Sequence, residues 1–200
     1  PLVKINGLAN LQAAIAQGKG VILLGMHLST LDFCGAVLAS YVGFDVMYRR
    51  NKNSLLESIM TRGRERNHPH AIDREDVRKV IGNLKKGHAV WYGADQDYGR
   101  KHSVFVPFFG QKAATITASS RLAKVNDSPV VLFTHYRSPD DSHYEIFLSE
   151  PLAAFPSDQP ETDATTINQH VERAILKQPD QYWWLHRRFK TQPEGMKRPY

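Results

Sequence analysis

His27 and Asp32 are the two side chains whose types and spacing first indicate chemistry in this sequence. An imidazole that hydrogen-bonds to a carboxylate through one nitrogen keeps its other nitrogen free to take a proton, as in acyl-transfer enzymes. On one straight helix, residues five apart would point roughly 140° away from each other, so the pair needs a bend between its members. Both residues also fit structural roles, Asp32 at a helix start and His27 as an ordinary loop histidine.

The segments on either side of the pair predict that bend. Residues 20–25 are a short apolar run bounded by glycines, which is typical of a buried strand. His27 follows the run, and Ser29 or Thr30 can cap a helix over residues 31–38 whose first turn carries the carboxylate of the pair. A strand, a short loop and a helix would then bring the two side chains to one corner.

The rest of the chain alternates between short apolar runs and amphipathic segments. The expected strands are residues 44–50, 88–94, 129–136 and 144–148, and the expected helices are residues 8–17, 55–60, 77–84, 115–125 and a last long helix around 167–175. Residues 104–110 are expected to be an apolar loop, and residues 151–160 a linker. We therefore predict an α/β fold with a mostly parallel central sheet, one antiparallel hairpin and helices on both faces.

Polar side chains follow three of the predicted strands directly. They are His27, the Arg49–Arg50 pair, and Asp95 with Asp97. Sites in parallel sheets form beyond the carboxyl ends of the strands. We therefore expect a base candidate, cations and carboxylates to converge at one edge of the sheet.

Composition limits the classes of protein and partner. Two hundred residues with 42% hydrophobic content suffice for one core, so a single domain over residues 1–200 is expected. Lys and Arg number 26 against 20 Asp and Glu, which favours acidic partners such as phosphorylated lipids, an acidic carrier protein or nucleic acid. The single cysteine, Cys34, lies in an apolar helix, where a small buried hydrophobe is a better interpretation than a nucleophile.

Four stretches of the chain resemble a known family. Residues 25–32 (GMHLSTLD), 48–66, 90–117 and 181–195 are similar, in order and spacing, to the late acyltransferases of lipid A biosynthesis, the lauroyl, palmitoleoyl and myristoyl transferase group. This group belongs to the wider lysophospholipid and glycerol-phosphate acyltransferase superfamily, so the resemblance implies a glycerol-phosphate acyltransferase-like fold. Members normally carry an N-terminal transmembrane helix, so we expect an anchor to be missing here and the protein to act at the cytoplasmic face of the inner membrane.

The resemblance also implies a reaction. Acyl-carrier protein would donate a fatty acyl group to a hydroxyl of an anionic lipid A precursor, without a cofactor or metal. His27 would take the proton of that hydroxyl, and Asp32 would hold the imidazole tautomer. Arg64 matches by position an arginine that is functionally important in the related enzymes.

Six further residues are expected to bind substrate. Arg49 and Arg50 suit phosphate groups or a solvated strand end equally well, and Asp95 stands where the superfamily has an acidic acceptor-binding motif, although the residues around it depart from that motif. Asp97 is a weaker candidate of the same kind.

Arg187 and Arg188 complete the six. They follow Trp183 and Trp184 in a mixture typical of a membrane-surface segment, or of a C-terminal helix that packs its aromatic residues into the core.

Other interpretations stay open on the sequence. The acceptor could be another phospho- or glycolipid, and the acyl chain could lie against Phe105, Phe108 and Phe109. A metal-dependent hydrolase could use His27, Asp32, Asp95 and Asp97 as ligands, although the sequence contains no Cys-x-x-Cys or His-Glu-x-x-His spacing. A basic module that binds lipid or nucleic acid is a third interpretation, but the sequence contains no recognised nucleic-acid motif, and we expect no nucleic-acid partner.

Overall fold

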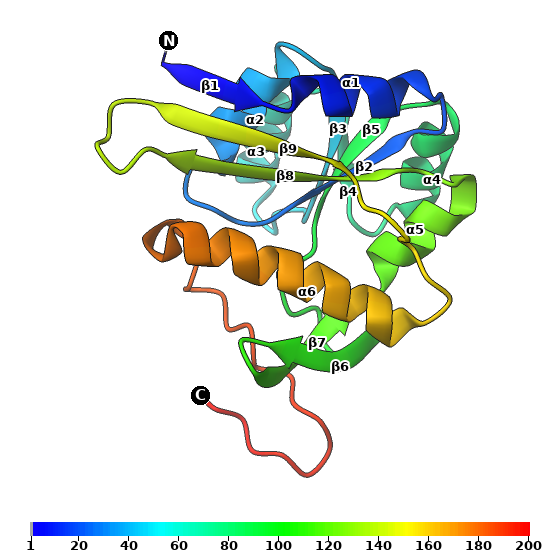
Figure 1. Ribbon diagram of the computed structural model, residues 1–200, viewed down its shortest axis with the longest axis vertical. Coiled ribbons are helices and arrows are strands. Elements are labelled where there is room, and N and C mark those ends of the chain that lie inside the picture. The colour runs from blue at the N-terminus through cyan, green and yellow to red at the C-terminus, as the bar shows by residue number, and fades with distance from the viewer. Residues whose placement is uncertain (1) are drawn as a thin grey trace.

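A seven-stranded sheet forms the centre of the computed structural model, which describes residues 2–200. Its strands are β1 (Val3–Asn6), β2 (Val21–Gly25), β3 (Phe44–Tyr48), β4 (Ala71–Asp73), β5 (Ala89–Gly93), β8 (Val130–Arg137) and β9 (Tyr144–Pro151). Their order across the sheet is β1-β9-β8-β2-β5-β3-β4 (Figure 1). All neighbouring pairs are parallel except β8 and β9, which form the predicted antiparallel hairpin. The predicted fold class is confirmed.

Helices cover both faces of this sheet because its buried strands are apolar on both sides. The helices are α1 (Leu8–Ala16), α2 (Leu31–Ala39), α3 (Ser54–Glu65), α4 (Val77–Lys85), α5 (Ala118–Asn126) and α6 (Pro160–Lys177). Successive residues of β2 point to opposite faces. Leu23 packs in one core with Leu38 of α2, and Leu24 packs in the other with Leu84 of α4.

The predicted loop at residues 104–110 is wrong. Strands β6 (Ser103–Phe108) and β7 (Gln111–Ile116) form a separate antiparallel hairpin that lies beside α6 (Figure 1). The alternation of buried Val106, exposed Pro107 and buried Phe108 has the period of a strand. The turn residues Phe109 and Gly110 both have positive φ, which suits a two-residue hairpin. Phenylalanine rarely adopts that conformation, so the turn was hard to predict.

Other element boundaries also differ from the prediction. The helix expected over 115–125 begins at Ala118, because residues up to Ile116 belong to β7. Helix α6 begins at Pro160, inside the expected linker, with proline in the first turn, where its missing N–H does no harm. Strands β1 and β4 are too short and too mixed in polarity to be predicted. Among the helices of residues 2–200, none combines the length and apolar character needed to cross a membrane.

Candidate active site

His27 and Asp95 form the central contact of the site. The His27 Nδ1 atom lies 2.8 Å from Asp95 Oδ1, and the backbone N–H of His27 donates to Asp95 Oδ2 at 3.0 Å. Asp95 is 2% exposed, whereas the His27 side chain is 29% exposed. A buried ionised carboxylate accepts from Nδ1–H, which leaves Nε2 as the nitrogen that can take a proton.

Strand register creates this contact. Strands β2 and β5 are parallel neighbours in which Gly25 pairs with Gly93. His27 and Asp95 each lie two residues beyond these glycines, so they meet at the carboxyl edge of the sheet. A Cβ atom on Gly93 would lie 2.9 Å from Cε1 of His27, so glycine is needed for the imidazole to lie this close to β5.

The C-terminal segment fixes the loop that carries His27. The Trp183 N–H donates to the carbonyl of His27 at 3.0 Å, and the Ser29 N–H donates to the carbonyl of Gln181 at 2.7 Å. The Tyr182 hydroxyl lies 3.4 Å from the carbonyl of Asp95. These contacts join residues more than 80 apart in the chain, and no local sequence signal indicates them.

The predicted contact between His27 and Asp32 is replaced by the contact with Asp95. The His27 ring turns toward the neighbouring strand end, whereas Asp32 lies in the first turn of α2 with an exposed side chain. Asp32 nevertheless lines the same cavity as His27. Asp95, expected to bind the acceptor, therefore occupies the place predicted for Asp32.

Burial and nearby carboxylates have opposite effects on the His27 pKa. Burial alone would lower it, but the hydrogen bond and charge of Asp95, together with the charge of Asp32, raise the pKa above 6.5. For Asp95, burial alone would raise the pKa, but the hydrogen bonds and charge of His27 lower it below the ordinary value. Burial raises the pKa of Cys34 to about 11, in agreement with its predicted role as a small buried side chain.

A cavity of about 450 Å³ opens beside His27. Its apolar walls include Leu28, Leu31, Phe44, Val46, Met47, Trp91, Phe133 and Trp183, and its charged residues are Asp32, Arg49 and Arg64. Phe105, Phe108 and Phe109 are not among the lining residues, and Phe108 packs in the core instead. The apolar walls therefore come from β3, β5, β8, the start of α2, and the segments that carry Leu28 and Trp183, and not from the β6–β7 hairpin.

Arg49 and Arg64 are the predicted cations that reach the cavity. Arg49 follows β3, and Arg64 lies in the last turn of α3, where its guanidinium carbon is 4.7 Å from the centre of the Tyr48 ring. Arg50 lies outside the cavity lining. Its side chain is exposed, and its Nε atom lies 3.8 Å from Oε1 of Glu57.

Three other predicted substrate-binding residues, Asp97, Arg187 and Arg188, lie outside the lining of this cavity. Asp97 accepts from the N–H groups of Gly99 and Thr191, both at 2.8 Å, and so holds its own loop and the C-terminal segment. Arg188 is 4% exposed and donates to the carbonyl of Ala114 at 2.7 Å. Arg187 is exposed. We therefore leave these three residues out of the candidate active site.

The aromatic residues before the two arginines are exposed, contrary to a C-terminal helix packed into the core. Trp183 and Trp184 are 50% and 54% exposed. The short helical turn η1 (Pro179–Gln181) ends before them, and it is Phe189 that packs against the core. The segment therefore presents tryptophan at the surface beside the cavity.

The metal ligand set considered from the sequence is not gathered in one place. Within residues 2–200, the group whose ligand atoms come within 4.8 Å of one another is Asp45, His70 and His88. These residues lie at the amino ends of β3, β4 and β5, whereas His27 and Asp95 follow the carboxyl ends of β2 and β5. The geometry at His27 is that of a hydrogen-bonded base and not of a ligand cluster.

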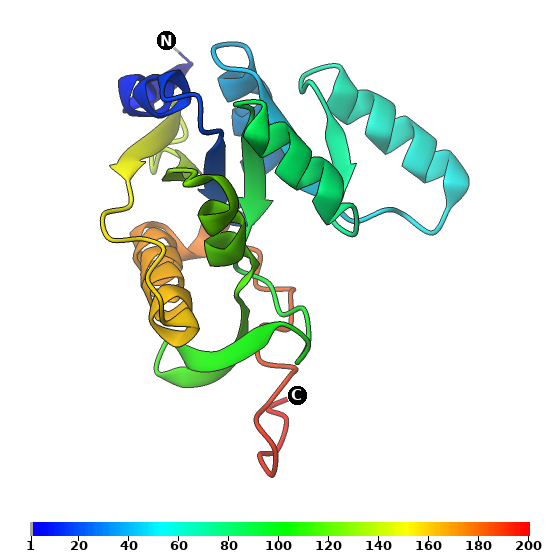
Figure 2. The ribbon, with the colours of Figure 1, turned by 90° about the vertical axis from the view of Figure 1, so that its right-hand side faces the viewer.

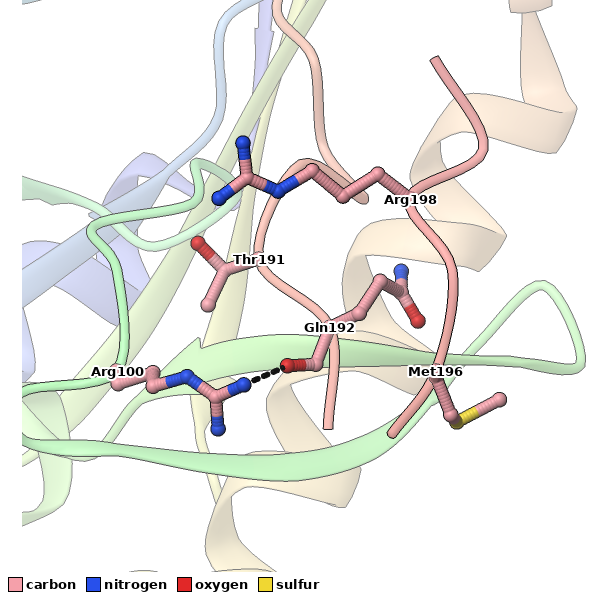
Figure 3. Close-up of a pocket in the computed structure, with 5 residues that line it drawn as sticks. All are labelled: Arg100, Thr191, Gln192, Met196 and Arg198. Atoms are coloured by element: carbon pink, nitrogen blue, oxygen red, sulfur yellow. Dashed lines mark hydrogen bonds between the residues drawn. The ribbon is translucent and has the colours of Figure 1, made fainter. Parts of the chain in front are cut away.

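A second cavity, of about 390 Å³, lies against the C-terminal segment. Figure 3 shows the Arg100 and Arg198 side chains extending from opposite sides, with Arg100 donating to the carbonyl of Gln192 at 2.6 Å. Among the described residues, those that line it differ from all those that line the cavity at His27. It is therefore a separate, cationic surface feature.

The architecture is that of a known fold. The chain superimposes on a crystal structure of the 1-acyl-sn-glycerophosphate (LPA) acyltransferase, PlsC, from Thermotoga maritima with a TM-score of 0.55 at 14% identity, over 88% of this chain and 72% of that one. The chain thus has a glycerol-phosphate acyltransferase-like fold, as predicted.

The family follows from the sequence comparison. A profile of the bacterial lipid A biosynthesis acyltransferases matches residues 1–191, and the chain belongs to this family. It is 38% identical over 192 residues to the lipid A biosynthesis palmitoleoyltransferase of Escherichia coli K12, covering 96% of this chain and 62% of that protein. It is also 38% identical over 198 residues to the lauroyltransferase of the same strain, covering 98% and 65%. The chain therefore spans less than two thirds of the length of these relatives.

Proposed function

We propose that this protein transfers a fatty acyl group from acyl-carrier protein to a hydroxyl of a lipid A precursor. The observation that carries the proposal is the His27–Asp95 hydrogen bond beside a cavity that has both apolar and cationic walls. The basic nitrogen suits activation of an alcohol, and the apolar walls suit an acyl chain. Family membership supports lipid A as the acceptor class.

The reaction needs no acyl-enzyme. The oxygen of the acceptor hydroxyl attacks the thioester carbonyl carbon while His27 Nε2 takes the proton of that hydroxyl. The carbon–sulfur bond then breaks, and the departing thiolate takes the proton back from the imidazolium. Asp95 holds the tautomer and stabilises the imidazolium, a role that suits its buried, hydrogen-bonded position.

The charged residues of the cavity complete the proposed site. Arg49 and Arg64 line the cavity, and in the proposed reaction their guanidinium groups stabilise the oxyanion of the tetrahedral intermediate or bind phosphate of either substrate. Asp32 adds a negative charge that favours the imidazolium form of His27. The catalytic set that we propose is therefore His27, Asp95, Asp32 and Arg64, with Arg49 as a phosphate-side residue.

The proposed partners follow from charge and family. A net charge of +6 favours both an acidic carrier protein and an anionic membrane surface. We propose that the protein acts at the cytoplasmic face of the inner membrane, as a peripheral or anchored enzyme, because its family and its net positive charge favour an anionic membrane surface.

The test is a product assay. The protein is incubated with a panel of acyl-carrier-protein thioesters and with tetra- and penta-acylated lipid A precursors, and the product masses are measured. We expect one added acyl group, lost in His27→Ala and retained in the control His170→Ala, which changes a histidine of α6 outside the cavity lining.

Other products would point to the alternatives. Acylation of lysophosphatidic acid but not of lipid A precursors would assign another phospholipid acceptor. Release of free fatty acid that stops on addition of a strong chelator would indicate a metal-dependent hydrolase. Equal activity of His27→Ala and the unmodified protein would contradict the proposed role of the imidazole.

A further inference from the structure

Helix α3 carries an apolar face that no other part of the described chain covers. Leu55, Leu56, Ile59 and Met60 are 68%, 48%, 58% and 42% exposed. Their spacing of one, three and four residues places them together along one side of the helix. We call these four residues the α3 apolar face.

Helix α3 differs from a helix that packs on a core, because its polar side faces the protein and its apolar side faces outward. None of the described residues Ser54–Glu65 is fully buried. The side toward the body of the protein is held by polar contacts, because Glu57 accepts from the Tyr48 hydroxyl at 2.5 Å and from the Asn51 N–H at 2.7 Å. Figure 2 shows α3 as the outermost helix on its side of the sheet. The α3 apolar face is therefore turned outward, and its residues do not pack against the core.

Cations lie beside this apolar face. Residues 49–66 contain six Lys and Arg against two Glu, and Lys52, Arg62 and Arg66 are all exposed. Lys52 precedes the helix, and the two arginines lie at its C-terminal end. Apolar side chains between cations suit a surface that offers both hydrocarbon and negative charge.

The α3 apolar face belongs to an element that borders the proposed active site. Arg64, on the same helix, lines the cavity at His27. Trp183 lines that cavity as well, and it begins a second exposed apolar segment with Trp184 and Leu185, which is 80% exposed. Two elements with exposed apolar side chains therefore each contribute a residue to the lining of one cavity.

We infer that the α3 apolar face docks on an anionic lipid membrane and holds the cavity at the bilayer surface. This inference rests on the proposed function in one respect, that the acceptor is a membrane lipid. A lipid surface fits better than an acidic carrier protein, because four large aliphatic side chains need an apolar environment that an acidic surface does not supply. The aliphatic side chains enter the acyl boundary while Lys52, Arg62 and Arg66 meet the headgroup charges.

Vesicle co-sedimentation tests the inference without requiring activity. The probes are vesicles of phosphatidylcholine alone and vesicles of phosphatidylcholine with phosphatidylglycerol. We expect Leu55→Ser combined with Ile59→Ser to reduce partitioning into the anionic vesicles by about tenfold or more. The matched control combines Val77→Ser with Val125→Ser, which changes two exposed apolar residues of α4 and α5, and it should bind as the unmodified protein does.

A second experiment with the same vesicles tests the cations beside the α3 apolar face. Arg62→Gln and Arg66→Gln should each weaken binding to anionic vesicles by about fivefold and should leave the weaker binding to neutral vesicles unchanged. Lys85→Gln with Lys86→Gln, at the exposed end of α4, is the control. Thermal unfolding of every variant should match the unmodified protein, because the altered side chains are exposed.

Three results would overturn the inference. In the first, the Leu55→Ser, Ile59→Ser protein binds vesicles as well as its control. In the second, that variant keeps vesicle binding but loses binding to acyl-carrier protein, which would make the face a carrier-protein site. In the third, sedimentation velocity shows a dimer that the variant abolishes, which would make the face a contact between two copies. Vesicle binding is measured without a reaction. A failure of the membrane-docking inference can therefore be distinguished from a failure of the proposed acyl transfer.

Discussion

Nδ1 of His27 lies 2.8 Å from Oδ1 of Asp95, across the carboxyl ends of two neighbouring parallel strands. The same carboxylate also accepts from the His27 N–H. The loop and the ring are thus held by one buried group, which prepares Nε2 as a base. Asp32, which the sequence placed in this role, instead contributes charge from the cavity wall.

The two carboxylates should therefore differ in importance. We predict that Asp95→Asn lowers kcat by about 10²–10⁴-fold, because a neutral amide no longer fixes the Nδ1–H tautomer or stabilises the imidazolium. Asp32→Asn should cost less, because its charge acts on His27 without a hydrogen bond. Steady-state kinetics of both variants give the comparison. A larger loss for Asp32→Asn would restore the pairing expected from the sequence.

The pH dependence should report the His27 pKa. A general base works only when neutral, and Asp95 and Asp32 raise the pKa of His27 above 6.5. We predict that kcat/KM falls as the pH drops through a midpoint above 6.5. In Asp95→Asn, burial is no longer outweighed by the hydrogen bond to Asp95, so the midpoint should move to lower pH. A midpoint that stays in place in this variant would contradict the contact.

Arg64 should matter more than its neighbour Arg66. Arg64 lines the cavity, whereas Arg66 is an exposed residue outside the lining. We predict that Arg64→Ala reduces kcat/KM by about 10- to 100-fold through loss of a charge-assisted hydrogen bond to substrate. Arg66→Ala, assayed with acceptor in detergent micelles, is the control and should retain activity. Equal effects would indicate a general role of positive charge.

Gly35 offers a way to shorten the cavity. It lies on α2 in the cavity lining, and a Cβ atom placed on it would meet no heavy atom of the described chain within 4 Å, apart from its chain neighbours and the backbone of its own helix. We predict that Gly35→Met shifts the preference toward shorter acyl chains, because the new side chain occupies cavity volume. Gly82→Met on α4, equally unobstructed but outside the lining, serves as control. Competition between thioesters of different length measures the preference.

Arg188 should affect stability more than substrate binding. Its guanidinium donates to Ala114 and Thr115 from a buried position. We predict that Arg188→Ala lowers the free energy of unfolding by about 2–4 kcal/mol. The adjacent Arg187 is exposed, and Arg187→Ala should change it by less than about 0.5 kcal/mol. Urea unfolding of the two variants tests this difference, and equal stabilities would contradict the structural role.

The sequence predicted the central strands well because their signal is local. The apolar runs that became β2 and β5 are buried on both faces, so every residue in them is apolar or glycine. The β6–β7 hairpin was missed because the first of its two turn residues is Phe109, and phenylalanine rarely adopts a positive φ. The strand ends at His27, Arg49 and Asp95 were correctly expected to carry polar groups, since each directly follows an apolar run.

The pairing of those polar groups could not be read from spacing. His27 and Asp32 are five residues apart, whereas His27 and Asp95 are 68 apart and meet only because β2 and β5 are aligned in register. Likewise, Arg187 and Arg188 are identical and adjacent in sequence. One is exposed and the other is buried against β7, because the fold of the C-terminal segment separates them.

The amino-acid sequence by itself determined the α/β class, the apolar strands, the histidine at a strand end and the family of the chain, since each depends on residue type and order. The tertiary structure decided which carboxylate contacts that histidine, which aromatic residues wall the cavity, and that the apolar side of α3 faces outward. These depend on strand register and helix orientation, which are set by contacts between residues far apart in the chain.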